Sequence, residues 1–236
     1  MRVLITGSTQ GIGLEVAKQL VKEGYQVFVH CSKDLEKAER ICKEIGAYKG
    51  VVADLSSLEE TKGLFNKTGP VDCLILNASV QYKNFWLDIT DEEFEKQVNI
   101  NLRSTLKLMQ AYYPSMKENG FGRIITIGSV NQYNNHQELS LYGATKCAVY
   151  HLIENVAKYG APYGVTANNV APGAIATPRN QAVQDDKRLL KEVESKIPMG
   201  RFGMANEVAN VVSMLCKKES SYITGSDIVI DGGMRL

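Results

Sequence analysis

Residues 6–13 read Thr6-Gly7-Ser8-Thr9-Gln10-Gly11-Ile12-Gly13 and join a short apolar run to an amphipathic stretch. Glycine tolerates a tight turn, and the free N–H groups at the start of a helix favour an anion. We therefore expect Gly7 to permit the turn, Gly11 to let the backbone approach a pyrophosphate, and Gly13 to let the helix pack closely. The segment predicts a dinucleotide site between the first strand and the first helix.

Short apolar runs alternate with longer amphipathic stretches along the whole chain. Runs that are apolar on both faces and separated by helical segments are typical of a parallel sheet covered on both sides. The sequence therefore predicts an α/β fold, a single-domain Rossmann-type doubly wound parallel sheet of about seven strands flanked by helices over residues 1–236. The expected strands are residues 3–6, 26–31, 50–53, 71–76, 123–127, 165–170 and 227–230.

Several of the predicted helices begin at a residue that can cap them. Asp34 precedes the second helix, and Ser56 or Ser57 precedes the third. Thr90 with Glu93 three residues later has the spacing of a capping box.

The segment from about residue 177 to residue 201 interrupts the alternation. It is charged, it follows the sixth strand, and Pro178 and Pro198 flank it. We expect it to form a substrate lid.

Composition favours one globular domain that acts on a small molecule. The chain has 236 residues, of which 44% are hydrophobic, and its net charge is +1 with both signs interspersed. This balance argues against nucleic acid or an anionic membrane as a partner. No apolar run reaches the roughly 18 residues of a membrane span, and none near Met1 resembles a signal peptide. We therefore expect a cytoplasmic protein without a membrane partner.

The cysteines and histidines point away from a metal centre. The five cysteines have no CxxC spacing, which argues against a disulfide framework and against zinc, so we expect reduced thiols. The three histidines, His30, His136 and His151, have no partner at metal spacing. We predict no metal site.

Tyr142 and Lys146 lie four residues apart, on one face of a predicted helix. A free tyrosine has a pKa of about 10, and a neighbouring cation favours the phenolate and so brings the group toward useful acid–base chemistry. Ser129 follows the fifth strand, at the sheet edge where α/β proteins place their chemistry. Its hydroxyl could bind a substrate carbonyl oxygen and stabilise the charge that develops on it.

The choice of cofactor depends on the end of the second strand. A carboxylate there would bind the ribose hydroxyls of NAD(H) and repel a 2′-phosphate, but Cys31 occupies the position, and its neighbours contain no carboxylate until Asp34. Lys33 and the hydroxyl of Ser32 suit a 2′-phosphate. We favour NADP(H), and NAD(H) remains the alternative.

With the GxxxGxG spacing, Ser129, Tyr142 and Lys146 in order, essentially the whole chain resembles the short-chain dehydrogenase/reductase family. The resemblance implies that Asp54-Leu55 contact the adenine. Asn77-Ala78-Ser79 resembles the Asn-Ala-Gly motif of the cofactor pocket, with Ser79 in place of glycine. The predicted cofactor-binding residues are Gly7, Ser8, Thr9, Gln10, Gly11, Ile12, Gly13, Ser32, Lys33, Asp54, Leu55, Asn77, Ala78, Tyr142, Lys146, Pro172, Gly173, Ile175 and Thr177.

The same resemblance assigns the catalytic roles. Tyr142 would be the acid or base, Ser129 would orient the carbonyl, and Lys146 would also hydrogen-bond the nicotinamide ribose. Asn101 matches the family asparagine that holds a water in the proton relay to the lysine. The predicted reaction interconverts a carbonyl and a secondary alcohol by hydride transfer with NADP(H).

Residues 122–130 and 222–225 are similar to bacterial 3-oxoacyl-[acyl-carrier-protein] reductases, which makes a 3-oxoacyl thioester one open substrate class. Residues 131–138 are unusually polar, so a polar or hydroxylated substrate stays equally open. An NAD(H)-dependent sugar or polyol dehydrogenase and a non-catalytic dinucleotide-binding sensor are the alternatives. Phe85 and Trp86 either wall the substrate cleft or pack in the core or against another subunit.

The resemblance also implies a homo-oligomer. Relatives commonly form tetramers through the helices that here span about residues 92–117 and 142–159. We expect a homotetramer or a homodimer.

Overall fold

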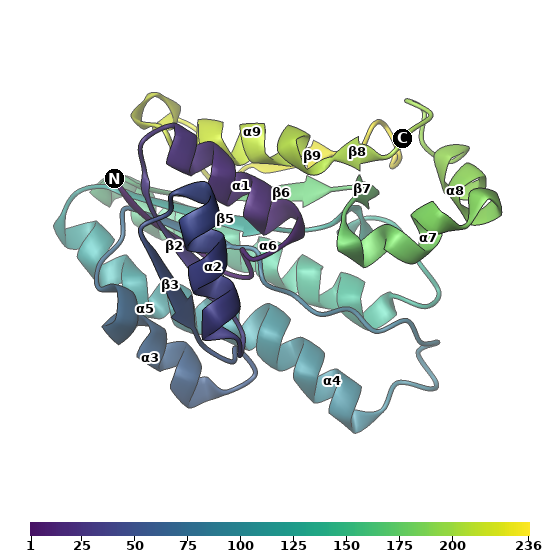
Figure 1. Cartoon of the computed structure of the whole chain (residues 1–236), viewed down its shortest axis with the longest axis horizontal. Coiled ribbons are helices and arrows are strands. Elements are labelled where there is room, and N and C mark those ends of the chain that lie inside the picture. Colours follow the sequence, from purple (N-terminus) through teal and green to yellow (C-terminus); the bar gives the residue numbers. More distant parts are fainter.

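A computed structural model describes residues 1–236, and its centre is a seven-stranded parallel sheet with the order β3-β2-β1-β4-β5-β6-β9 (Figure 1). Strands are added toward one edge of the sheet from β1 to β3 and toward the other edge from β4 onward, so the order reverses between β1 and β4. β1 pairs in parallel with both β2 and β4. All seven predicted strands are confirmed, with ends that lie within two residues of those expected. The strands are β1 Arg2–Ile5, β2 Gln26–Cys31, β3 Lys49–Val52, β4 Cys73–Leu76, β5 Gly122–Ile127, β6 Val165–Pro172 and β9 Asp227–Ile230.

Helices cover both faces of the sheet, so the predicted doubly wound architecture is confirmed (Figure 1). Helices α1 Gly11–Lys22, α2 Leu35–Ile45 and α9 Ala205–Cys216 lie on one face, and α3 Leu58–Thr68, α5 Ser104–Glu118 and α6 Ser140–Gly160 lie on the other. A separate apolar core fills each side. None of the helices combines the length and the apolar character needed to cross a bilayer.

The predicted caps explain where the helices begin. The Asp34 side chain accepts the backbone N–H of Lys37, and Ser57, rather than Ser56, caps α3. Thr90 and Glu93 form a reciprocal capping box at the start of α4 Asp91–Gln97. Each cap satisfies N–H groups that the first helical turn leaves unpaired.

The helix expected over residues 92–117 is interrupted by a π-helical turn, Val98–Arg103, between α4 and α5. The Asn101 side chain occupies this turn and hydrogen-bonds the backbone of Val80 and the hydroxyl of Thr145. Widened turns of this kind are frequent at functional sites, and periodicity in the sequence does not reveal them.

The segment after β6 contains structure that the sequence did not predict. β7 Ile175–Ala176 pairs in parallel with β8 Gly203–Met204, and two helices, α7 Gln181–Asp185 and α8 Lys187–Glu194, lie between them. Strands of two residues are too short to produce an alternating pattern. The pairing of β7 with β8 brings the two ends of this segment together. The helices between them, α7 and α8, lie at one end of the main sheet, in green in Figure 1.

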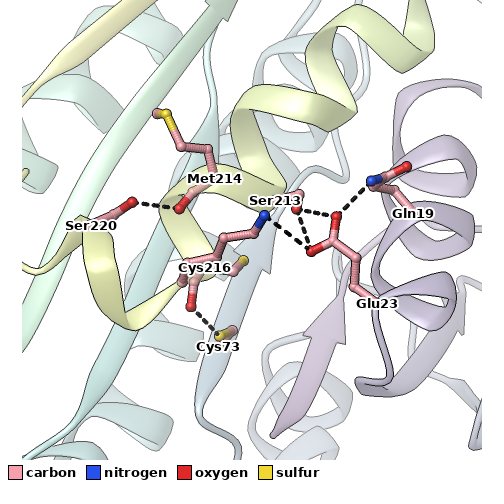
Figure 2. A network of polar contacts seen from close by, with 8 residues as sticks. Gln19, Glu23, Cys73, Ser213, Met214, Cys216 and Ser220 are labelled. Carbon is pink, nitrogen blue, oxygen red and sulfur yellow. Dashed lines mark hydrogen bonds and ion pairs between the residues drawn. The ribbon is translucent and has the colours of Figure 1, made fainter.

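A polar network joins α1 to α9 (Figure 2). The Glu23 carboxylate, at the end of α1, accepts hydrogen bonds from Ser213 Oγ at 2.7 and 2.8 Å and from Gln19 Nε2 at 2.6 Å. Lys217 Nζ lies 3.7 Å from the same carboxylate. Burial alone would raise the pKa of Glu23, but these donors outweigh it and hold the pKa below its usual value. The network fixes two helices of one face against each other.

Candidate active site

A cavity of about 700 Å³ opens at the carboxyl ends of the strands, where the strand order reverses. In open α/β sheets this switch point is where ligands bind. Its walls come from the turn after β1, the ends of β2, β4 and β5, the start of α6, and the segment after β6.

The glycine turn has the conformation that its sequence predicts. Gly7 and Gly11 have φ values of +63° and +57°, a region that other residues rarely adopt. A Cβ at Gly13 would lie 2.6 Å from the carbonyl oxygen of Gly7 and 2.6 Å from Asn77 Nδ2, so a side chain there would disrupt the turn. Of the predicted turn residues, Gly7, Thr9, Gln10, Gly11 and Ile12 line the cavity, whereas Ser8 and Gly13 lie behind it.

His30, in β2, is hydrogen-bonded to the glycine turn. The sequence did not predict it as a site residue. Its Nδ1 accepts the N–H of Gly7 at 3.0 Å, and its Nε2 lies 3.0 Å from the carbonyl oxygen of Ala53. Burial lowers the pKa of His30 to about 4, so the ring is neutral at physiological pH and donates through Nε2. A lone histidine on a strand carries no sequence signal for this role.

Ser8 and Asn77 also brace the turn. Ser8 is fully buried, and its hydroxyl donates to the carbonyl oxygen of Ile5 and accepts the N–H of His30. Asn77 Nδ2 donates to the carbonyl oxygens of Thr6 and Gly7 at 2.9 and 3.0 Å. These side chains therefore shape the cofactor turn.

The end of β2 presents lysines rather than an acid to the cavity. Ser32, Lys33 and Lys37 line it together with Asp54 and Leu55. Lys33 Nζ lies 3.4 Å from a carboxylate oxygen of Asp54. Lys37 also lines the cavity, and the sequence did not identify it because it lies in the first turn of α2 and not at the strand end itself.

The predicted catalytic residues meet beside this turn. Tyr142 and Lys146, from α6, are each 4% exposed, and Ser129, directly after β5, is 8% exposed. Lys146 Nζ donates to the carbonyl oxygen of Ile127 at 2.7 Å and lies 5.5 Å from the centre of the Tyr142 ring. Ser129 Oγ accepts the N–H of Asn131 at 3.2 Å, which fixes the serine at the start of a short 3₁₀ turn, Val130–Gln132.

Electrostatics favour an acidic phenol at Tyr142. Burial alone would raise the pKa of Tyr142, but the positive charges of Lys146 and Arg179 and the hydroxyls of Ser129 and Ser79 outweigh it. The pKa of Tyr142 is therefore below its usual value. Burial lowers the pKa of Lys146, and the Arg179 charge adds to that effect.

Known proteins resemble this chain over almost its whole length. The family described as Enoyl-(Acyl carrier protein) reductase matches residues 7–235. The chain is 33% identical over 240 residues to the 3-oxoacyl-[acyl-carrier-protein] reductase FabG of Staphylococcus aureus, across 98% of this chain and 96% of that protein. The 3-oxoacyl-[acyl-carrier-protein] reductase MabA of Mycobacterium tuberculosis is 36% identical over 237 residues, which are 98% of this chain and 92% of that protein. The chain belongs to the short-chain dehydrogenase/reductase family.

A solved structure of this family superposes closely. The 3-oxoacyl (acyl-carrier-protein) reductase of Agrobacterium tumefaciens C58, with NADP bound, has a TM-score of 0.92 at 32% identity, and the match covers 98% of this chain and 93% of that one. The predicted resemblance to the short-chain dehydrogenase/reductase family and to its 3-oxoacyl reductases is thus confirmed.

Asn101, predicted to be the relay asparagine, is 2% exposed. Its Oδ1 accepts the N–H of Val80 at 2.9 Å, while Nδ2 donates to the carbonyl oxygen of Val80 and to Thr145 Oγ1. The side chain therefore joins the segment after β4 to α6 and makes no direct hydrogen bond to Lys146. Its role in a water relay stays a prediction.

Arg179 is a further residue of the cavity that the sequence motifs did not identify. It lies in a 3₁₀ turn, Pro178–Asn180, of the predicted lid. Its Nη2 donates to the carbonyl oxygen and the hydroxyl of Ser79 at 2.7 and 3.0 Å, and its Nη1 is 3.5 Å from the Tyr142 hydroxyl. Ser79, which stands where the family motif has glycine, does not have a positive φ, so a side chain is accommodated there without backbone strain, and its hydroxyl accepts a hydrogen bond from Arg179.

The other predicted segments divide between the cavity and the surface. Pro172, Gly173, Ile175 and Thr177 line the cavity, as do Asn131 and His136 of the polar loop. Phe85 and Trp86 do not, since they are 50% and 69% exposed outside it. The expectation that they wall the cleft is therefore wrong, and so is the alternative that they pack in the core of the chain.

Proposed function

We propose that this protein is a cytoplasmic NADP(H)-dependent oxidoreductase that reduces a carbonyl to a secondary alcohol, with 3-oxoacyl thioesters among its substrates. One observation carries the proposal: buried Tyr142, with a pKa below its usual value, shares a cavity with Ser129, Lys146 and a phosphate-binding glycine turn. The FabG and MabA relatives, which are named for this reaction, support the substrate class.

The residues of the cavity suit NADP(H). Lys33, Lys37 and the Ser32 hydroxyl surround the place where the adenosine ribose would lie in this family, and a 2′-phosphate is well bound by cations and a hydroxyl. The acid in this region that could select NAD(H), Asp34, is engaged as the cap of α2. NADPH would supply the hydride that reaches the carbonyl carbon.

The protein's own groups would handle the oxygen and the proton. The Ser129 hydroxyl would donate a hydrogen bond to the carbonyl oxygen and hold it next to Tyr142. As negative charge develops on that oxygen, the Tyr142 hydroxyl would transfer its proton and complete the alcohol. Lys146 would stabilise the resulting phenolate until the proton is replaced from solvent, by a path that we assign to the wall containing Asn101.

The decisive experiment follows the absorbance of NADPH with acetoacetyl-coenzyme A as the substrate. We expect turnover with NADPH and a lower kcat/KM with NADH, and formation of the 3-hydroxyacyl product. A non-catalytic dinucleotide sensor would bind NADPH, seen by its fluorescence, and oxidise none of it. That result would refute the proposal.

We also propose that the chain forms one domain with a lid over about residues 177–201, and that it assembles as a homotetramer or homodimer. The lid is supported by Arg179, Asn180, Val183 and Val193, which line the cavity. Reduced thiols at all five cysteines fit the cytoplasm. A monomeric mass in light scattering at micromolar concentration would exclude the oligomer.

A further inference from the structure

The charged side chains around the cavity are almost all positive. Asp54 is the single acidic residue of the lining, and it lies at the adenine end beside Lys33. Lys33 and Lys37 fit the cofactor, and Lys146 is assigned to the phenol. The remaining cations of the lining are Lys83 from the segment after β4, Lys96 from α4 and Arg179 from the lid, and of these Arg179 contacts the Tyr142 hydroxyl.

Arg179 lies next to the Tyr142 hydroxyl, which we assign as the proton donor. Its Nη2 is committed to Ser79, which aims the guanidinium, while Nη1 has only the long 3.5 Å contact with the Tyr142 hydroxyl. No carboxylate of the chain pairs with it, because none of the seven ion pairs includes Arg179. A positive charge without a protein counter-ion thus faces the place where the substrate oxygen must bind.

We propose that Arg179 binds a carboxylate of the substrate, so that the preferred substrate is an oxo acid with its carboxylate a few bonds from the reacting carbonyl. A planar guanidinium matches a carboxylate geometrically, and such charge-assisted pairs are stronger than neutral hydrogen bonds. The phosphate of a coenzyme or carrier arm is separated from the carbonyl by many bonds, so it cannot reach a group that touches Tyr142. The inference rests on the proposed carbonyl reduction and narrows its substrate.

The test compares an acid with its own neutral ester. Acetoacetate and methyl acetoacetate contain the same 3-oxo group, and NADPH oxidation is followed with each. We expect the wild type to prefer acetoacetate, and Arg179→Met to lower kcat/KM for the acid by about 10- to 100-fold, the value of a charged hydrogen bond. The ester should lose only what the change at Tyr142 costs, so the ratio of kcat/KM for the acid to kcat/KM for the ester should fall by about 10-fold or more. Arg179→Lys should recover part of the activity on the acid.

Two controls separate the possible failures. Arg188→Met removes the same charge from an exposed position of α8 that does not line the cavity, and should leave activity on both substrates unaffected. Equal losses on acid and ester in Arg179→Met, or a wild-type preference for the ester, would overturn the carboxylate assignment.

If acid, ester and acetoacetyl-coenzyme A all fail to turn over, the proposed function fails. Calorimetry with 3-hydroxybutyrate then tests separately whether Arg179 binds a carboxylate. Binding that Arg179→Met abolishes would support it, and no binding to the NADP-loaded wild type would overturn it.

Discussion

A Cβ placed on Gly143 would lie 2.6 Å from the carbonyl oxygen of Asn131. Gly143 follows Tyr142 on α6, and Asn131 belongs to the 3₁₀ turn that Ser129 caps. Ser129 and Tyr142, to which we assign catalytic roles, are therefore held at their separation by a direct approach of one backbone to another. Any side chain at residue 143 would have to push the two elements apart.

Gly143→Ala should consequently damage both catalysis and folding. Displacement of Ser129 relative to Tyr142 should lower kcat by about 10- to 100-fold, because small misplacements of reacting groups are costly. Overpacking should cost about 1–3 kcal/mol of unfolding free energy. Kinetics and urea denaturation measure the two effects. The control is Gly63→Ala in α3, where a Cβ would meet nothing within 4 Å. Wild-type kcat in Gly143→Ala would show that the close approach does not set the geometry.

The sequence predicted the sheet, and it predicted that Ser129, Tyr142 and Lys146 lie near the glycine turn, because both depend on local patterns. Seven apolar runs gave the strands, and strand-to-turn positions gave the glycine turn and Ser129. Residues that act through contacts distant in sequence could not be found in that way. His30 and Gly7 are 23 positions apart, and Arg179 and Ser79 are 100 apart, so only the fold reveals their contacts. The π-helical turn at Asn101 was missed because a single extra residue does not disturb the helical pattern enough to be seen.

Cofactor selectivity should depend on the lysines at the end of β2. Removing both charges in Lys33→Gln/Lys37→Gln should raise KM for NADPH by about 10-fold or more and leave KM for NADH nearly unchanged, since only a 2′-phosphate uses them. Steady-state kinetics with both cofactors measures the ratio. Lys43→Gln, near the far end of α2, is the matched control. A parallel loss with NADPH and NADH would contradict the assignment of a 2′-phosphate site.

The pH dependence of kcat should follow the protonation of the Tyr142 phenol. Burial would raise its pKa, but Lys146 and Arg179 hold the pKa below the usual value. Reduction needs the protonated phenol, so kcat for reduction should fall as the pH rises through this pKa, and alcohol oxidation should rise over the same range. Arg179→Met removes a cation that favours the phenolate. The pKa of Tyr142 then rises, and both limbs should move to higher pH, whereas Arg179→Lys should move them less. If kcat for reduction falls at the same pH in Arg179→Met as in the wild type, Arg179 does not influence the pKa of Tyr142.

His30 should make the protein lose stability in mild acid. Its pKa is about 4 in the folded chain and about 6.5 when unfolded, so the unfolded state binds a proton first. Its contribution is complete above about pH 6.5 and is lost as the pH falls toward about 4. Between about pH 7.5 and about pH 5, the wild type should lose about 2 kcal/mol of unfolding free energy through this group.

Urea denaturation of His30→Asn at the same two pH values isolates this contribution. Asparagine has no titrating group, so the unfolding free energy lost between the two pH values should be smaller by about that amount in His30→Asn. The control is His151→Asn, at an exposed position on α6, which should lose as much as the wild type. An acid loss in His30→Asn as large as in the wild type would show that the titration of this ring does not matter.

The most direct test of the central claim is a single-turnover measurement with Tyr142→Phe. The variant keeps the ring and its packing and removes the hydroxyl that we assign as the proton donor. With enzyme-bound NADPH and acetoacetyl-coenzyme A or acetoacetate, hydride transfer should slow by about 100- to 10,000-fold, while the Kd for NADPH should change little. Hydride transfer at the wild-type rate in Tyr142→Phe would contradict the account.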